Sequence, residues 1–255
     1  MKTRLTPPCL FTALALACGV SRADSTFNMP EGSHDISLSL TAFDAPRSEG
    51  GKRREVAVLP SFSGRWSNGI VASPGQVLWD VSDDPVFDYG PLVSYGLGQT
   101  RTDDSSNKIR LDIEGGGFAT FLFDEHIRFN GVLAYGGGAR HSGVRLIADV
   151  DFSMRLGQHG TLSVSPGFEA VNASYMKSSF GVTPAQSAND HLDPYVTHPG
   201  VKNLFVNVVG NWQLSNKWSL APGVQTSYLM GSAAHTPLTQ RRTDETVYLQ
   251  LGYHW

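Results

Sequence analysis

Apolar and polar side chains alternate with a period of two along most of the chain from residue 35 onward. In residues 144–156, seven apolar side chains occupy every second position, and the positions between them include Arg145, Asp149, Asp151 and Arg155. Because successive side chains of a strand point to opposite faces of a sheet, this pattern predicts β-strands with one apolar and one polar face.

The predicted strands are long, and the connections between them are of two kinds. The runs of about 11–13 residues match a tilted transmembrane strand better than an ordinary strand of about 5–6 residues. Short connections at 124–126, 157–160 and 215–217 alternate with long polar ones at 99–112, 175–200 and 230–242. One rim of tight turns and one rim of large loops is typical of an outer-membrane β-barrel.

Eight strands are expected after residue 85, at about 86–98, 113–123, 127–139, 144–156, 161–174, 201–213, 218–229 and 243–255. Two more are expected at 55–65 and 69–79, and 35–43 is an eleventh candidate. Because single-chain bacterial barrels have an even number of strands, we predict an all-β, antiparallel up-and-down barrel of ten strands over residues 55–255. Twelve strands are the alternative. The ten-strand reading places residues near 55 at the same rim as the C-terminus and makes residues 24–54 a periplasmic or inward extension.

The first 23 residues have the pattern of a cleaved signal peptide. Lys2 and Arg4 precede a short apolar run from Leu10 to Val20, and small residues follow it at Ser21 and Ala23. Lipid attachment at Cys18 is an alternative. No later stretch approaches the roughly 18 apolar residues that a membrane helix needs. We expect export to the outer membrane of a Gram-negative cell.

Composition narrows the possible functions of the exported chain. Both cysteines, Cys9 and Cys18, lie in the signal peptide, so residues 24–255 have no thiol or disulfide chemistry. After residue 23 the chain has 17 basic and 23 acidic residues, and this acidic balance argues against nucleic acid as a partner.

The polar strand faces are expected to line the lumen. Arg145, Asp149, Asp151 and Arg155 alternate in sign along one such face. A charged, selective channel is one interpretation. The other is a charge ladder that fills a narrow barrel without conducting, because ten strands is close to the eight at which interior side chains fill the lumen.

Two glycine runs, 115–117 and 136–138, are expected on neighbouring strands with Gly115 opposite Tyr135. A ring lying over a strand glycine is a known stabilising arrangement. No hydrolase, metalloprotease or cysteine-based motif is present. His191 and His198 share a loop, which is weak evidence for a metal site. We expect no enzyme activity, no cofactor and no metal.

The chain ends with aromatic and apolar side chains at every second position, Leu251, Tyr253 and Trp255. This ending resembles the C-terminal signal by which outer-membrane barrels engage the barrel-assembly machinery. Other aromatic residues lie near the ends of the runs, as they do where a barrel meets the lipid interface.

The string Tyr-Met-Lys-Ser-Ser-Phe-Gly-Val-Thr-Pro-Ala-Gln-Ser-Ala at 175–188 resembles the MipA/OmpV family of outer-membrane proteins. The resemblance implies a scaffold that holds a periplasmic lytic transglycosylase and a peptidoglycan synthase. A small solute channel, gated by its long extracellular loops, is the alternative. We expect Tyr175, Phe180 and Pro184 to fold the long loop into the barrel mouth. Residues 43–54 depart from the family because they lack its acidic, tyrosine-containing segment.

Overall fold

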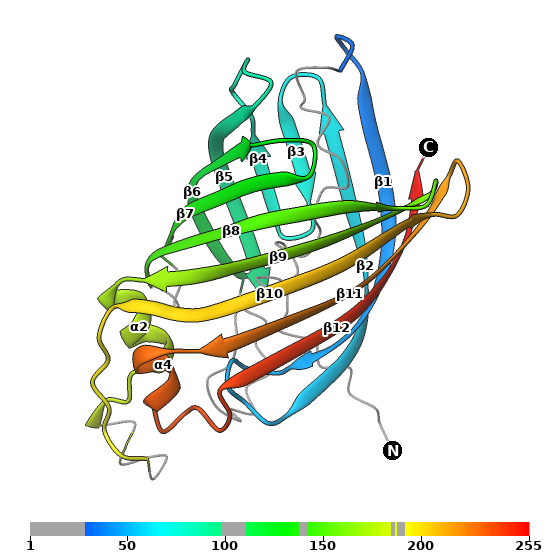
Figure 1. Ribbon diagram of the computed structural model, residues 1–255. Helices are drawn as coiled ribbons and strands as arrows, with labels where there is room; N and C mark the ends of the chain where they lie inside the picture. The colour runs from blue at the N-terminus through cyan, green and yellow to red at the C-terminus, as the bar shows by residue number, and fades with distance from the viewer. Residues whose placement is uncertain (1–28, 98–110, 138–141, 185–186, 188–191, 255) are drawn as a thin grey trace.

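The computed structural model describes residues 29–97, 111–137, 142–184, 187 and 192–254 (Figure 1). Twelve strands and two helices are assigned within these ranges. In chain order they are β1 (His34–Pro46), β2 (Arg54–Trp66), β3 (Ile70–Ser73), β4 (Gln76–Trp79), β5 (Phe87–Leu97), β6 (Leu111–Leu122), β7 (Ile127–Gly137), β8 (Ser142–Leu156), β9 (Gly160–Val171), α2 (Ala173–Phe180), β10 (Gly200–Gln213), β11 (Trp218–Leu229), α4 (Gly231–His235) and β12 (Thr243–His254).

The strands form a closed antiparallel barrel in which each strand pairs with its neighbours in the chain. Pairing of β1 with β12 closes the cylinder, with Ser37 opposite His254 and Asp44 opposite Val247. The first and last described strand ends therefore lie together at one rim, which also carries the tight turns (Figure 1). We call it the short-turn rim and the opposite one the long-loop rim.

The strand count of twelve agrees with the alternative and not with the favoured ten. The run at 69–79 is a hairpin of two four-residue strands, β3 and β4, because Pro74 and Gly75 form a tight turn in which Gly75 has φ +85°. This extra reversal places Arg54 at the long-loop rim, opposite to the expected side. The segment at 34–46 is β1, a full wall strand, so the barrel begins at His34 and not at residue 55.

The outer wall is apolar, as the period-two pattern predicts. Leu38, Leu40 and Leu249 are about half exposed, and so are many other outward side chains. Aromatic contacts on the outer wall lie near the short-turn rim, between Phe62 and Trp66, Phe87 and Tyr89, Phe121 and Phe129, and Trp218 and Tyr253. No helix in the described ranges is long and apolar enough to cross a membrane.

Glycines allow large side chains to lie across the lumen. A Cβ atom at Gly223 would overlap the ring of Tyr248, and one at Gly167 would overlap the ring of Phe205. The expected pairing of Gly115 with Tyr135 is present, but a Cβ at Gly115 would meet no atom within 4 Å. The Tyr135 ring therefore does not cover Gly115, and the glycine–aromatic arrangement occurs on other strands.

Candidate functional site

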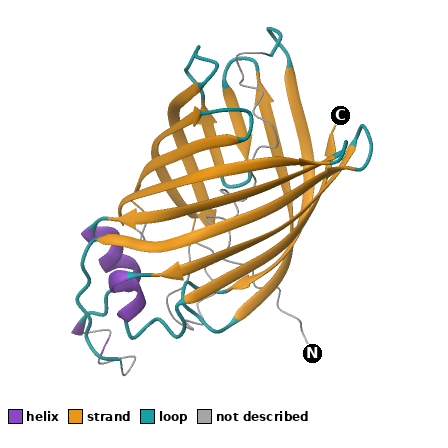
Figure 2. Ribbon diagram, in the orientation of Figure 1, coloured by secondary structure: helices purple, strands orange, loops and turns teal. Residues whose placement is uncertain are grey.

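The long-loop rim is capped by two short helices that the alternating pattern did not predict (Figure 2). Helix α2 begins where β9 ends, because Asn172 Oδ1 accepts a hydrogen bond from the Tyr175 backbone N–H at 2.9 Å. The asparagine is the only local signal of a helix start. Buried side chains of α2 and α4 form one apolar cluster with the ends of β9 and β11; it consists of Val171, Tyr175, Met176, Phe180, Leu229, Ala233 and Ala234.

The three rim-loop residues singled out from the sequence have different surroundings. Tyr175 and Phe180 are buried in the apolar cluster, whereas Pro184 is exposed. The backbone carbonyl of Phe180 accepts a hydrogen bond from Thr236 Oγ1 at 2.7 Å, which joins the two capping segments. Burial also raises the pKa of the Tyr175 hydroxyl, so this side chain stays neutral.

A lysine missed by the sequence reasoning lies at the centre of this cap. Lys202 has the same parity as Leu204 and Val206, which face outward, yet its side chain is only 2% exposed. A β-bulge between Val201 and Asn203 turns it inward. Because a lysine facing lipid is costly, its position in an otherwise apolar face was the available signal.

Lys202 joins three segments of the chain through buried charges. Its Nζ lies 2.7 Å from Glu49 Oε1, in the β1–β2 loop, and 2.7 Å from Glu169 Oε2 on β9. The same Nζ is 5.5 Å from the ring centroid of Tyr175 on α2. Removing Lys202 takes this ammonium group away from both carboxylates, and breaking a buried ion pair by removing one partner is strongly unfavourable.

Arg145 extends the network to β6 and β8. Its Nε donates to Glu114 Oε2 at 2.7 Å, and its Nη1 lies 3.9 Å from Glu169 Oε1. A hydrogen bond also holds the β1–β2 loop to β12: the Gly50 N–H donates to Asp244 Oδ2 at 2.7 Å. We call the helices α2 and α4 together with Glu49, Glu114, Arg145, Glu169 and Lys202 the plug.

The four charges predicted to line the lumen do share one face of β8, but their partners are on other strands. Beyond Arg145, Asp149 Oδ2 accepts a hydrogen bond from Asn130 Nδ2 at 2.8 Å, and Asp151 Oδ2 accepts one from Ser165 Oγ at 3.2 Å. Arg155 is exposed near the short-turn rim. Within the described residues no ion pair joins two of the four. Their interactions therefore connect β8 to other strands and do not run along β8 itself.

An apolar cluster lines the lumen on one side of the barrel. It consists of Phe43, Ala45, Val209, Ala221 and Tyr248, with Ala57 and Leu59 packed against it. Its residues lie on β10, β11, β12, β1 and β2, which are consecutive in the barrel. We call this cluster the apolar layer.

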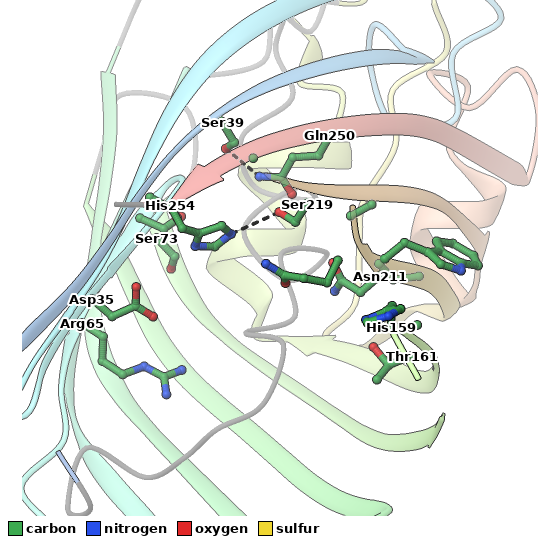
Figure 3. A pocket seen from close by; sticks show the side chains of 18 of the residues that line it. Asp35, Ser39, Arg65, Ser73, His159, Thr161, Asn211, Ser219, Gln250 and His254 are labelled. Atoms are coloured by element: carbon green, nitrogen blue, oxygen red, sulfur yellow. Dashed lines mark hydrogen bonds between the residues drawn. The ribbon is translucent and has the colours of Figure 1, made fainter. Parts of the chain in front are cut away.

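The short-turn rim opens into a cavity of about 940 Å³, which we call the mouth cavity (Figure 3). Its polar wall groups are mostly hydroxyl and amide side chains from strands on several sides of the barrel. Gln250 Nε2 donates to Ser39 Oγ at 2.7 Å, and Ser219 Oγ is 3.1 Å from His254 Nε2. Figure 3 shows these side chains directed into the cavity.

The Ser219–His254 pair is not a hydrolase triad in the described structure. A catalytic histidine needs a carboxylate or amide that orients its second nitrogen, and His254 has no such hydrogen bond among the contacts of the described residues. No group of three or more metal-binding side chains is found there either. His191 lies outside the described residues. The absence of enzyme activity, cofactor and metal stays a prediction.

The remaining expectations concern the two ends of the chain. Outward-facing Leu251 is 38% exposed, and the Tyr253 ring contacts the edge of Trp218 at 5.0 Å between centroids. Trp255 and the signal peptide at 1–23 lie outside the described residues, so the assembly signal and the cleavage remain predictions.

The family model described as MltA-interacting protein MipA matches residues 38–255. The chain belongs to the MipA family. The matched range begins inside β1 and covers the other eleven strands, which agrees with a barrel that includes β1. Family membership and the closed barrel together make this chain an outer-membrane β-barrel.

Solved structures give weaker similarities. The KdgM porin in complex with disordered oligogalacturonate has a TM-score of 0.47 at 12% identity, covering 84% of this chain and 97% of that one. The NanC porin has a TM-score of 0.49 at 10% identity, covering 85% and 98%. An outer membrane channel from Pseudomonas putida F1 has 0.41 at 10%, covering 92% and 99%. Scores below 0.5 have no bearing on what this MipA-family chain does. No curated protein matches it.

Proposed function

We propose that this MipA-family barrel is a scaffold that binds a periplasmic lytic transglycosylase at its short-turn rim, within an assembly that also holds a peptidoglycan synthase. The family description names an interaction with MltA. Tight turns are typical of the periplasmic rim of an outer-membrane barrel. The observation that carries the proposal is the difference between the two rims: buried charges and an apolar cluster lie at the long-loop rim, whereas the mouth cavity opens at the short-turn rim.

The shape of the short-turn rim determines how a partner binds. A specific interface usually buries about 800 Å² on each partner, and the tight turns alone offer little surface. Residues 34–46 do not add any, because they form β1 in the wall. The concave mouth cavity supplies the additional surface, so we infer that a partner segment enters it.

A photo-cross-linking amino acid tests the rim. Asn216, in the β10–β11 turn, and Lys52, in the β1–β2 loop, are both exposed and lie at opposite rims. We expect a cross-link to the transglycosylase from position 216 and none from position 52. Cross-linking from position 52, or from neither position in cells that produce the enzyme, contradicts the scaffold proposal.

A gated solute pore is the second candidate, favoured by the polar mouth cavity and by helices α2 and α4 of the plug, which lie in connections between wall strands. In planar bilayers a pore predicts discrete conductance steps from the unmodified protein under some voltage or solute condition. A scaffold predicts no conductance steps, together with co-purification of the transglycosylase.

A further inference from the structure

We propose that the mouth cavity binds the end of an acidic glycan whose sugars carry acetamido groups. The inference rests on the proposed function only for the orientation of the short-turn rim toward the periplasm. The binding chemistry follows from the shape, the wall composition and the charge of the cavity itself.

The shape of the cavity favours the end of a chain. Its volume of about 940 Å³ lies within the range of about 300–1,000 Å³ for small-molecule sites. Val209 and Ala221 belong both to the cavity lining and to the apolar layer that contains Phe43 and Tyr248. The apolar layer therefore borders the cavity on the side of β10 and β11, and a glycan that enters from the short-turn rim meets this surface with its leading end.

The walls match the hydrogen-bonding groups of a sugar. Neutral hydroxyls and amides, which donate and accept, are the most numerous polar side chains in the lining. Several are already held in position: Ser39 Oγ lies 2.6 Å from Ser61 Oγ and accepts from Gln250 Nε2. The apolar floor offers a surface for the C–H face of a ring or for the methyl of an acetamido group, as such sites combine apolar contact with a few placed polar groups.

The charge of the cavity favours an acid. Among the described residues of the lining, Asp35 is the only carboxylate, and it stands directly opposite Arg65 in the β1–β2 register (Figure 3). Arg155 lies on β8, and no carboxylate of the described residues is within ion-pair distance of it. The lining therefore has two arginines and one carboxylate. Because Asp35 lies opposite Arg65, Arg155 is the group that receives a sugar carboxylate. An arginine binds a carboxylate through two parallel hydrogen bonds.

Calorimetric titration of the full-length barrel in detergent tests this assignment. The acidic probe is the disaccharide N-acetylglucosaminyl-N-acetylmuramic acid, and the neutral probe is diacetylchitobiose. We expect Arg155→Gln to weaken binding of the acidic probe about tenfold, as the loss of one charge-assisted contact implies, and to leave the neutral probe unchanged. Asn211→Leu, in the cavity wall, should weaken both probes. Arg242→Gln makes the same charge change at the long-loop rim and should alter neither.

The outcomes separate the parts of the inference. Equal loss of both probes in Arg155→Gln, or no loss, overturns the role of Arg155, and absence of binding by either probe overturns the proposal. Binding to peptidoglycan strands whose stem peptides have been removed, as well as to the disaccharide, identifies strand ends as the ligand, whereas binding to the disaccharide alone identifies a free turnover product. A pull-down of the transglycosylase with the Asn211→Leu variant is a separate measurement. If it contradicts the scaffold proposal, the glycan-binding result still stands.

Discussion

The ammonium group of Lys202 lies 5.5 Å from the ring centroid of Tyr175, and so joins a strand of the barrel wall to the helix that covers the rim. Such a contact contributes about 2 kcal/mol when it is desolvated. Because Lys202 also pairs with Glu49 and Glu169, one side chain holds the helix, the β1–β2 loop and the wall together. Helix α2 and the β1–β2 loop should therefore move together.

Replacing Lys202 with methionine should open or loosen the plug. The change leaves Glu49 and Glu169 without their cation, and breaking a buried pair costs about 3–5 kcal/mol. We expect a lower unfolding temperature in detergent and conductance steps in planar bilayers. Lys217→Met is the matched control, because Lys217 also lies over a tyrosine ring, 5.8 Å from the centroid of Tyr253, but at the other rim. Identical behaviour of the two variants would show that the Lys202 network does not hold the plug.

Replacing residues 178–190 with a short Gly/Ser turn should leave the barrel folded and increase its permeability. The strand pairs are not touched, but the cap loses Phe180, which is only 3% exposed. Larger conductance or greater sensitivity of cells to bulky antibiotics is the expected readout. Pro184→Ala, an exposed position in the same segment, should change neither. A folded variant with unchanged permeability would show that the segment 178–190 does not restrict passage through the lumen.

Alanine at Gly223 should destabilise the barrel, because its Cβ would overlap the ring of Tyr248. Overpacking of this kind costs about 1–3 kcal/mol. Alanine at Gly115 meets open space and should be neutral or stabilising by up to about 1 kcal/mol, since glycine weakens a strand. Urea unfolding followed by tryptophan fluorescence compares the two. Equal stability would show that Tyr248 moves aside without loss of packing.

Deletion of Trp255 should impair assembly much more than it affects a barrel that has already folded. The expectation comes from the alternation that ends at the last residue. Heat-modifiable gel mobility of the membrane fraction measures the folded amount, and Trp79→Ala, which removes a half-exposed aromatic elsewhere on the wall, is the control. Normal amounts of folded protein in the deletion strain would rule out an assembly signal at Trp255.

The sequence by itself determined the barrel class and nearly all strand bounds from β5 onward. The eight ranges expected after residue 85 agree closely with β5–β12. The physical reason is local: a strand with lipid on one side and a polar lumen on the other must alternate at every residue. The same alternation determined that Arg145, Asp149, Asp151 and Arg155 share a face.

The first strands show where local pattern was insufficient. The run at 69–79 was predicted as one strand. The Pro74–Gly75 turn divides it into two, and this additional reversal of the chain determines at which rim each earlier strand begins and ends. The role of 34–46 depended on β12, which lies at the far end of the chain. Barrel closure is a contact between the chain's two ends, so no window of neighbouring residues contains it.

Only the tertiary structure decided which charges meet at the long-loop rim. Glu49, Glu169 and Lys202 are far apart in the chain, and they meet because the bulge at Val201/Asn203 reverses the direction of one side chain. A bulge breaks the period that allowed the strands to be recognised. The network could therefore not be predicted from alternation, since its central residue is the one that departs from it.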